Sequence, residues 1–175
     1  MHIKHIFLLL SLSLAGTQAY AVSRIQHWQS SQGGQVYFVA SPGLPMVDIR
    51  LVFGAGSARD GEHEGIASLT ASLLETGAGQ WNADQLAQRF DDVGAQFQYA
   101  TSKDTSSVSL RTLTQADLFA QALTTFEQII SQPRFATQDF QRIKDQTLVR
   151  LKQQQERPGY IAKKEFYQSL YAQHP

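Results

Sequence analysis

Four segments of the chain have the short apolar patterns that predict β-strands. Residues 35–39 (QVYFV) follow a Gly-Gly turn, and in residues 47–53 (VDIRLVF) apolar side chains recur at every second position. Residues 96–99 and 107–111 show the same alternation on either side of a polar turn. The last two segments therefore predict an antiparallel hairpin.

Elsewhere the apolar residues recur every three or four positions, which is the period of a helix. Five helices are predicted: one from Ile66 to the glycines at 77 and 79, one from Asn82 to Gly94, one after Thr114, one after Thr137, and one over Tyr160–Tyr171. Strands and helices thus occur in pairs along the chain. This order favours an α+β fold, with helices packed on a mostly antiparallel sheet.

Three polar residues are expected to cap these helices. Asn82 with Gln85 three residues later matches a capping box, whereas Thr114 and Thr137 are simpler N-cap candidates. The helix after Thr137 is expected to bury one stripe of side chains, formed by Phe140, Ile143, Thr147 and Leu151.

The first 21 residues have the composition of a cleavable secretory signal. A short positive head precedes an apolar run over residues 6–15, and Ala19 and Ala21 supply small residues at the cleavage site. The run is too short to span a membrane, and the alternative is a buried hydrophobic helix. We expect a mature chain over residues 22–175, without a transmembrane helix, secreted across the inner membrane to the periplasm.

The amino-acid composition and the absence of certain motifs argue against several classes of protein function. The 175 residues hold 15 Lys and Arg against 15 Asp and Glu, and a balanced charge argues against a nucleic-acid-binding protein. The absence of cysteine excludes disulfides, thiolate zinc sites and cysteine nucleophiles. No serine stands in a G-x-S-x-G elbow, and no glycine-rich phosphate loop is present.

One local cluster carries ligand-type atoms for a metal. Glu62, His63 and Glu64 are consecutive, so their side chains diverge on a strand or a helix and grip one ion only in an unusual loop. A solvated polar loop is the favoured interpretation, and a metal site is the weaker alternative. After residue 21, no two histidines have the spacing of a helical zinc motif.

Residues 44–59 (LPMVDIRLVFGAGSAR) resemble the second strand of the insulinase/pitrilysin-type metallopeptidases. In that family a helix beginning Gly-Leu-Ala follows and carries the inverted zinc motif HxxEH; residues 65–77 (GIASLTASLLETG) correspond to it. The later segment 135–144 (FATQDFQRIK) also fits. The resemblance covers roughly residues 25–175 and implies a first peptidase domain, incomplete at its C-terminus, over residues 22–175.

The zinc motif itself differs from the family pattern. Position by position, the stretch Ser68-Leu69-Thr70-Ala71-Ser72 replaces HxxEH, so serines occupy both histidine positions and alanine that of the glutamate base. The third ligand, a glutamate, falls near Val149 or Arg150, and the nearest acids are Asp145 and Glu156. No catalytic residue, metal ligand or cofactor is therefore predicted in this chain.

The resemblance implies a noncatalytic homologue that pairs with an active subunit. Such a subunit would carry an intact HxxEH motif and the zinc ion, and the pair would act on peptides or proteins in the periplasm. Two alternatives remain open at this point: a scaffold or assembly protein with the same fold, and a zinc peptidase with an unorthodox site at residues 62–64.

Overall fold

The computed structural model describes residues 24–171, which form two units, residues 24–44 and 45–171. The predicted signal peptide lies outside the described residues. The smaller unit is an antiparallel hairpin of β1 (Ile25–Gln29) and β2 (Gln35–Val39), in which the rings of His27 and Tyr37 stack with centroids 4.5 Å apart. The prediction for residues 35–39 is confirmed, while β1 was not predicted.

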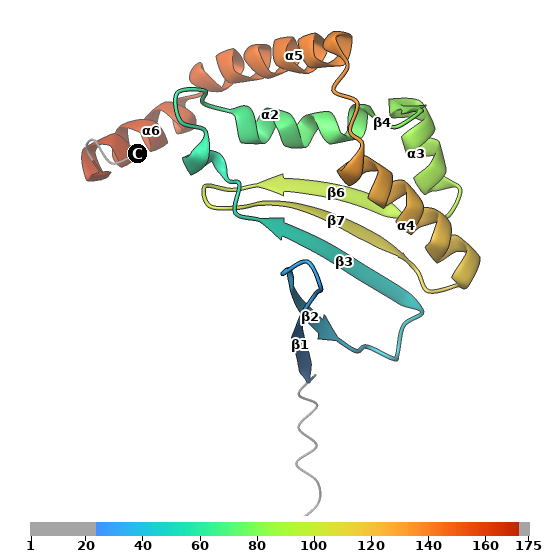
Figure 1. The fold of residues 1–175 in the computed structure, drawn as a ribbon. Helices are drawn as coiled ribbons and strands as arrows, with labels where there is room; N and C mark the ends of the chain where they lie inside the picture. The colour runs from blue at the N-terminus through green and yellow to red at the C-terminus, as the bar shows by residue number, and fades with distance from the viewer. Residues whose placement is uncertain (1–23, 172–175) are drawn as a thin grey trace, which may run out of the picture. The chain divides into compact units, whose positions relative to one another are not determined.

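The larger unit contains a three-stranded antiparallel sheet in the order β3-β7-β6 (Figure 1). Its strands are β3 (Met46–Phe53), β6 (Gln96–Thr101) and β7 (Ser106–Leu113). The predicted antiparallel hairpin is confirmed, because β6 pairs with β7 in register from Gln96↔Arg111 to Thr101↔Ser106.

The two faces of this sheet differ in polarity. One cross-strand row, Ile49–Leu110–Phe97, belongs to the apolar face that carries the core. On the other face Arg111 donates two hydrogen bonds to Asp48, Nε to Oδ1 at 2.7 Å and Nη2 to Oδ2 at 2.9 Å. These bonds hold the pKa of Asp48 below its ordinary value.

In the described part of the chain, five α-helices accompany the sheet. They are α2 (Ile66–Leu73), α3 (Ala83–Asp91), α4 (Ala116–Ser131), α5 (Thr137–Gln155) and α6 (Pro158–Tyr171). Short elements flank α2: the 3₁₀ turns η1 (Ser57–Arg59) and η2 (Leu74–Thr76), and the two-residue strands β4 (Gly77–Ala78) and β5 (Trp81–Asn82). Figure 1 shows α2 above the sheet and α5 above α2, and α4 packs on β7. The predicted α+β class is confirmed.

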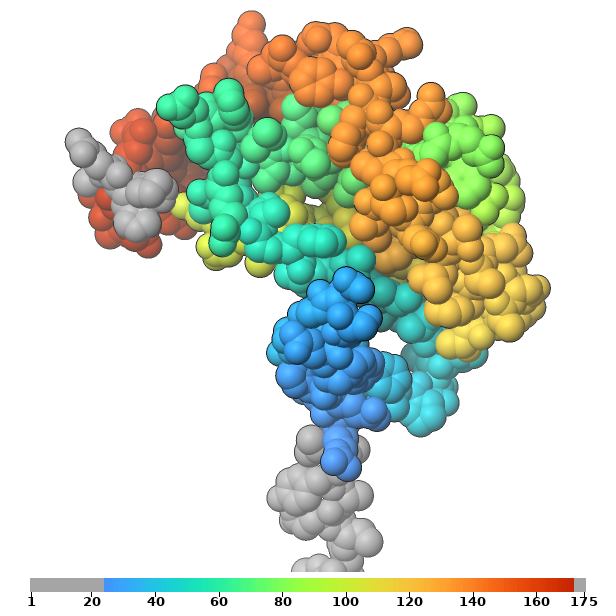
Figure 2. All heavy atoms as spheres, in the orientation of Figure 1, coloured from blue at the N-terminus to red at the C-terminus, as the bar shows by residue number. Residues whose placement is uncertain are grey.

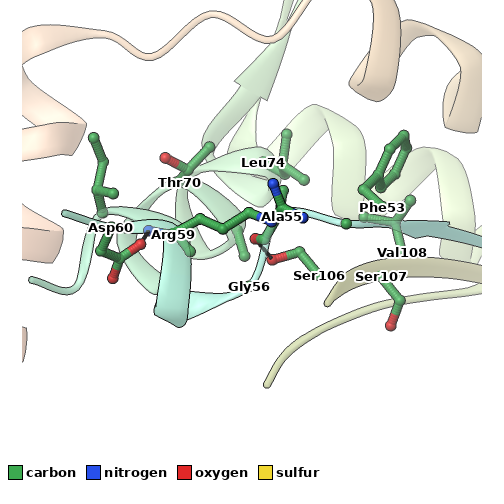
Figure 3. Close-up of a pocket in the computed structure, with 14 residues that line it drawn as sticks. Phe53, Ala55, Gly56, Arg59, Asp60, Thr70, Leu74, Ser106, Ser107 and Val108 are labelled. Atoms are coloured by element: carbon green, nitrogen blue, oxygen red, sulfur yellow. Dashed lines mark hydrogen bonds between the residues drawn. The ribbon is translucent and has the colours of Figure 1, made fainter. Parts of the chain in front are cut away.

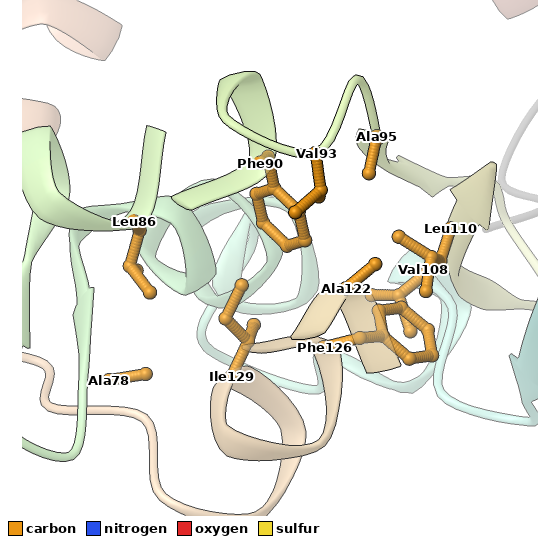
Figure 4. Packing of buried hydrophobic residues seen from close by; sticks show 10 residues of the cluster. All are labelled: Ala78, Leu86, Phe90, Val93, Ala95, Val108, Leu110, Ala122, Phe126 and Ile129. Atoms are coloured by element: carbon orange, nitrogen blue, oxygen red, sulfur yellow. The ribbon is translucent and has the colours of Figure 1, made fainter. Parts of the chain in front are cut away.

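The hydrophobic core lies between α3, α4 and the sheet (Figure 4). Its best-buried large members include Leu86 on α3, Phe126 and Ile129 on α4, and Leu110 on β7. The buried hydroxyl of Thr125 has hydrogen-bond partners: it accepts from Arg89 Nε at 3.0 Å and donates to a helix carbonyl. The interior of this region is therefore mainly apolar.

Helix starts follow the sequence expectation in one case of three. Asn82 caps α3 in a full capping box with Gln85, as predicted. The two threonine predictions are wrong, because the N-cap residues are Gln115 and Ala136, neither of which caps through its side chain. Thr114 instead donates its backbone N–H to Pro45 O at 2.9 Å, which extends the pairing of β3 with β7 by one residue.

Candidate functional site

The start of α2 is fixed by a buried carboxylate five residues upstream. Asp60 Oδ2 accepts the N–H of Gly65 at 2.8 Å, and Oδ1 accepts that of Ala67 at 3.0 Å. Gly65 has φ +91°, a conformation that glycine adopts at little cost. Two of the otherwise unpaired N–H groups at this helix end are thereby satisfied. The sequence interpretation took this stretch for a polar turn and missed the cap, because five residues exceeds the usual N-cap spacing.

Ser68 and Ser72 lie one turn apart on α2, on the side that faces α5. Ser72 Oγ donates a hydrogen bond to the carbonyl oxygen of Ser68 at 3.0 Å. Both serines line a cavity of about 620 Å³ together with α5 residues, among them Thr147 and Arg150. In the space-filling view the orange atoms of α5 lie against the green atoms of α2 (Figure 2). The two histidine positions of the family motif therefore share one face.

Ala71 opens onto a different cavity. It is buried and helps to line a mainly apolar space of about 360 Å³ between α2 and the ends of β3 and β7. Figure 3 shows Phe53, Thr70, Leu74 and Val108 around this space. The side chain at the position of the family's glutamate is a methyl group against apolar neighbours, which offers no proton acceptor.

A second cavity on the α5 side is polar. It has a volume of about 420 Å³ and lies between α2, β6 and α5, where its wall includes Ser72, Glu75, Tyr99, Arg142 and Arg150. Ser72, Thr147 and Arg150 belong to the walls of both cavities on this side, so these cavities meet at Ser72. Tyr99, Glu75 and Arg142 were not among the sequence-predicted site residues.

Of the two predicted positions for a third ligand, only Arg150 lies at these cavities. Val149 is 57% exposed and lines none of the cavities described above. The nearest acids are elsewhere: Asp145 accepts a hydrogen bond from Gln141 Nε2 at 2.9 Å, and Glu156 is the C-cap of α5. Of the two candidate positions, the one at the cavity walls thus carries a guanidinium.

The Glu62-His63-Glu64 cluster lies exposed in the turn between η1 and α2. His63 and Glu64 line the 620 Å³ cavity with Ser68, whereas Glu62 does not. Over residues 24–171 no three His, Cys, Asp or Glu side chains are grouped so that they could hold a metal ion. Within the same range, every helix is too short or too polar to cross a membrane.

Two charged groups on the polar cavity have defined surroundings. Partial desolvation raises the pKa of Glu75 above its ordinary value. Arg142 Nη2 pairs with Asp139 Oδ1 at 2.9 Å. Within residues 24–171 Arg150 forms no ion pair, and Glu75 is the acidic residue on the same cavity wall.

The predicted buried stripe of α5 is wrong. None of its described residues is buried, and Phe140 and Leu151 are 38% and 41% exposed. The reason is that α5 packs on α2 across the two cavities instead of on the sheet. The apolar periodicity of α5 therefore marks the side that faces α2.

A family model described as insulinase (peptidase family M16) matches residues 35–175. The chain belongs to this family. The resemblance to insulinase-type metallopeptidases is thereby confirmed.

Similar proteins and solved structures agree with the family assignment. A non-peptidase homolog, YmxG, from Helicobacter pylori is 27% identical over 169 residues, which are 95% of this chain and 39% of that protein. The crystal structure of a peptidase M16 inactive domain from Pseudomonas fluorescens superimposes with a TM-score of 0.83 at 37% identity, over 87% of this chain and 37% of the other. Pitrilysin shares the fold, with a TM-score of 0.65 at 20% identity over 82% of this chain and 15% of its own. The chain spans less than two fifths of the length of these relatives.

Proposed function

We propose that this M16 family member is noncatalytic and serves as the partner subunit of a zinc endopeptidase. One observation carries the proposal: the residues at the motif positions cannot bind zinc. These residues are Ser68, Ala71 and Ser72, and the candidate for the third ligand that lies at the cavities is Arg150. All four ligand and base positions differ from the family pattern at once, within a helix pair whose arrangement is retained.

The residues present do not fit a catalytic zinc ion. Such a site needs three protein ligands drawn from histidine and carboxylate or thiolate groups, with an open position for water. Serine hydroxyls are poor substitutes, and the hydroxyl proton of Ser72 is already donated to Ser68 O. Arg150 is permanently cationic and repels a divalent cation. Ala71 supplies no base, so a water held there would not be activated.

The names of similar proteins support the same conclusion. The Helicobacter pylori relative is described as a non-peptidase homolog, and the Pseudomonas fluorescens structure as an inactive domain. The proposal extends these descriptions to this chain, in which Ser68, Ala71 and Ser72 are the residues that correspond to HxxEH.

The proposed role as a partner subunit rests on the retained fold. A retained fold without zinc chemistry can still enclose and hold a peptide while an active subunit with HxxEH supplies the zinc and the base. The predicted signal at residues 1–21 supports a periplasmic location for such a pair.

Affinity purification tests the proposal. The tagged full-length protein is recovered from its own cells, and associated proteins are identified by mass spectrometry. We expect a near-stoichiometric companion with an intact HxxEH motif and peptidase activity in the purified pair. Recovery in complexes that contain no HxxEH subunit would contradict the proposal and favour a scaffold role.

A further inference from the structure

The polar cavity between α2, β6 and α5 carries more positive than negative charge on its wall. Arg142 and Arg150 line it, and Glu75 is the acidic residue of the wall. Tyr99 and Thr147 add hydroxyl-bearing side chains. A guanidinium presents five N–H donors in a fixed planar fork, which matches the geometry of a carboxylate. The lining is therefore suited to an anion and unsuited to a metal ion.

We propose that this cavity binds a peptide carboxylate, with Arg150 as its principal contact. Arg150 forms no ion pair within residues 24–171, so its donors are available to a ligand. Arg142 Nη2 donates a hydrogen bond to Asp139 Oδ1 at 2.9 Å, and the guanidinium of Arg142 retains further N–H donors. The two arginines are eight residues apart on α5, about 12 Å along the helix axis, with Gln146 between them on the same wall.

The size and lining of the cavity favour a peptide over a small inorganic anion. A volume of about 420 Å³ lies within the range of pockets that hold organic ligands, and an inorganic phosphate would leave most of it empty. Ala83, Ile143 and the ring of Tyr99 add apolar surface for the atoms next to the carboxylate. Ser72 borders the cavity as well, so the ligand would lie at the vacated zinc position.

This inference goes beyond the proposed function, because it concerns a ligand of this chain alone and needs no companion subunit. The two ideas can therefore fail separately. A chain that binds carboxylates but has no peptidase companion refutes only the partner role, and a chain with a companion but without carboxylate binding refutes only the carboxylate site.

Calorimetric titration of the full-length protein tests the site with three probes. They are acetyl-Ala-Ala-Ala with a free C-terminus, the same peptide as its C-terminal amide, and acetyl-Ala-Asp-Ala as its amide. We expect at least one carboxylate peptide to bind about tenfold tighter than the uncharged amide, since charge-assisted bidentate bonds are lost in the latter. The tighter of the two carboxylate peptides identifies a main-chain or a side-chain source. Equal binding of all three peptides, no binding, or tighter binding of inorganic phosphate would overturn the inference.

Variants locate the binding. Arg150→Gln is expected to weaken binding of the preferred peptide by about tenfold. Arg150→Lys should have an intermediate affinity, because lysine keeps the charge but lacks the planar fork of guanidinium N–H donors. Glu75→Gln is expected to tighten binding by about threefold, because it removes a competing negative charge from the wall. Arg157→Gln is the matched control outside the cavity and should leave the affinity unchanged. Equal losses in the Arg150 and Arg157 variants would contradict a specific site, and the peptide comparison on the unaltered protein holds even if a variant fails to fold.

Discussion

Two helix–helix contacts of this protein differ sharply in how they are packed. Between α3 and α4, Leu86, Phe126 and Ile129 are almost fully buried, although a cavity of about 660 Å³ opens beside them where α3 meets β6. Between α2 and α5 no side chain of α5 is buried, and cavities of about 420 and 620 Å³ remain. The first contact is part of the buried core, whereas the second leaves every described side chain of α5 at least partly exposed.

The difference indicates where the smaller side chains at the motif positions lie relative to the cavities. On α2 two serines and an alanine stand where the family has two histidines and a glutamate, and each replacement is smaller than the residue it replaces. Ser68 and Ser72 border the cavities between α2 and α5, whereas Ala71 lines the separate cavity towards β3 and β7.

The largest expected effect is a loss of stability when a buried side chain of the α3–α4 contact is truncated. Phe126→Ala should lower the free energy of unfolding of the full-length protein by ~3–5 kcal/mol, because it leaves a cavity in the core. Phe140→Ala on α5, where the ring is 38% exposed, should cost less than about 1 kcal/mol. Urea denaturation measures both. Similar losses would show that the two contacts are packed alike.

The second effect is a gain of metal binding at the open contact. The triple variant Ser68→His, Ser72→His, Arg150→Glu should bind zinc about 100-fold tighter than the matched triple with Val149→Glu, since only Arg150 lies at the shared wall. Competition with a chromophoric chelator gives both affinities. If the two triples bind zinc equally, the helix pair has not retained the ligand geometry.

A smaller effect is expected at the start of α2. Asp60→Ala removes two acceptors for helix N–H groups and should lower the stability by ~1–2 kcal/mol, while Asp60→Asn should lose about half as much. Asp104→Ala, in the exposed β6–β7 turn, is the control. Hydrogen exchange of the Gly65 and Ala67 amides should accelerate in the Asp60 variants. Unchanged exchange at these two amides would refute the cap.

The smallest effect is a pH dependence with opposite signs at two carboxyls. The pKa of Glu75 is raised above 4.5, so folding favours its protonated form; this stabilisation is present below pH 4.5 and is lost as the pH rises through the folded-state pKa. The pKa of Asp48 is lowered below 3.8 by Arg111, so that stabilisation is present above pH 3.8 and is lost on further acidification. The pH profiles of stability for Glu75→Gln and Asp48→Asn should therefore diverge from the unaltered protein in opposite directions. Parallel profiles would contradict these assignments.

The sequence predicted those parts of the fold that depend on local patterns. The bounds of β2, the capping box of Asn82 and the β6–β7 hairpin each follow from residues adjacent in the chain. Thr114 was misassigned because its N–H bonds to Pro45, a contact that depends on how β3 pairs with β7. β1 was missed because its sequence, IQHWQ, does not alternate regularly.

Only the site residues that correspond to the family motif were predicted from the sequence. That pattern gave Ser68, Ala71 and Ser72 and left Val149 and Arg150 as alternatives, of which only Arg150 lines the cavities between α2 and α5. Helical spacing alone could not distinguish a stripe that faces the sheet from one that faces another helix, so α5 was expected to be buried. The polar wall contributed by Glu75, Tyr99 and Arg142 comes from three separate elements, and no local signal unites them.

The most direct test of the central claim is the zinc content of the full-length protein, purified alone and assayed for peptide cleavage in the same preparation. The account predicts zinc far below one ion per chain and no cleavage, because Ser68, Ala71 and Ser72 supply neither ligands nor a base and Arg150 repels the ion. One tightly bound zinc per chain together with peptide cleavage would contradict it.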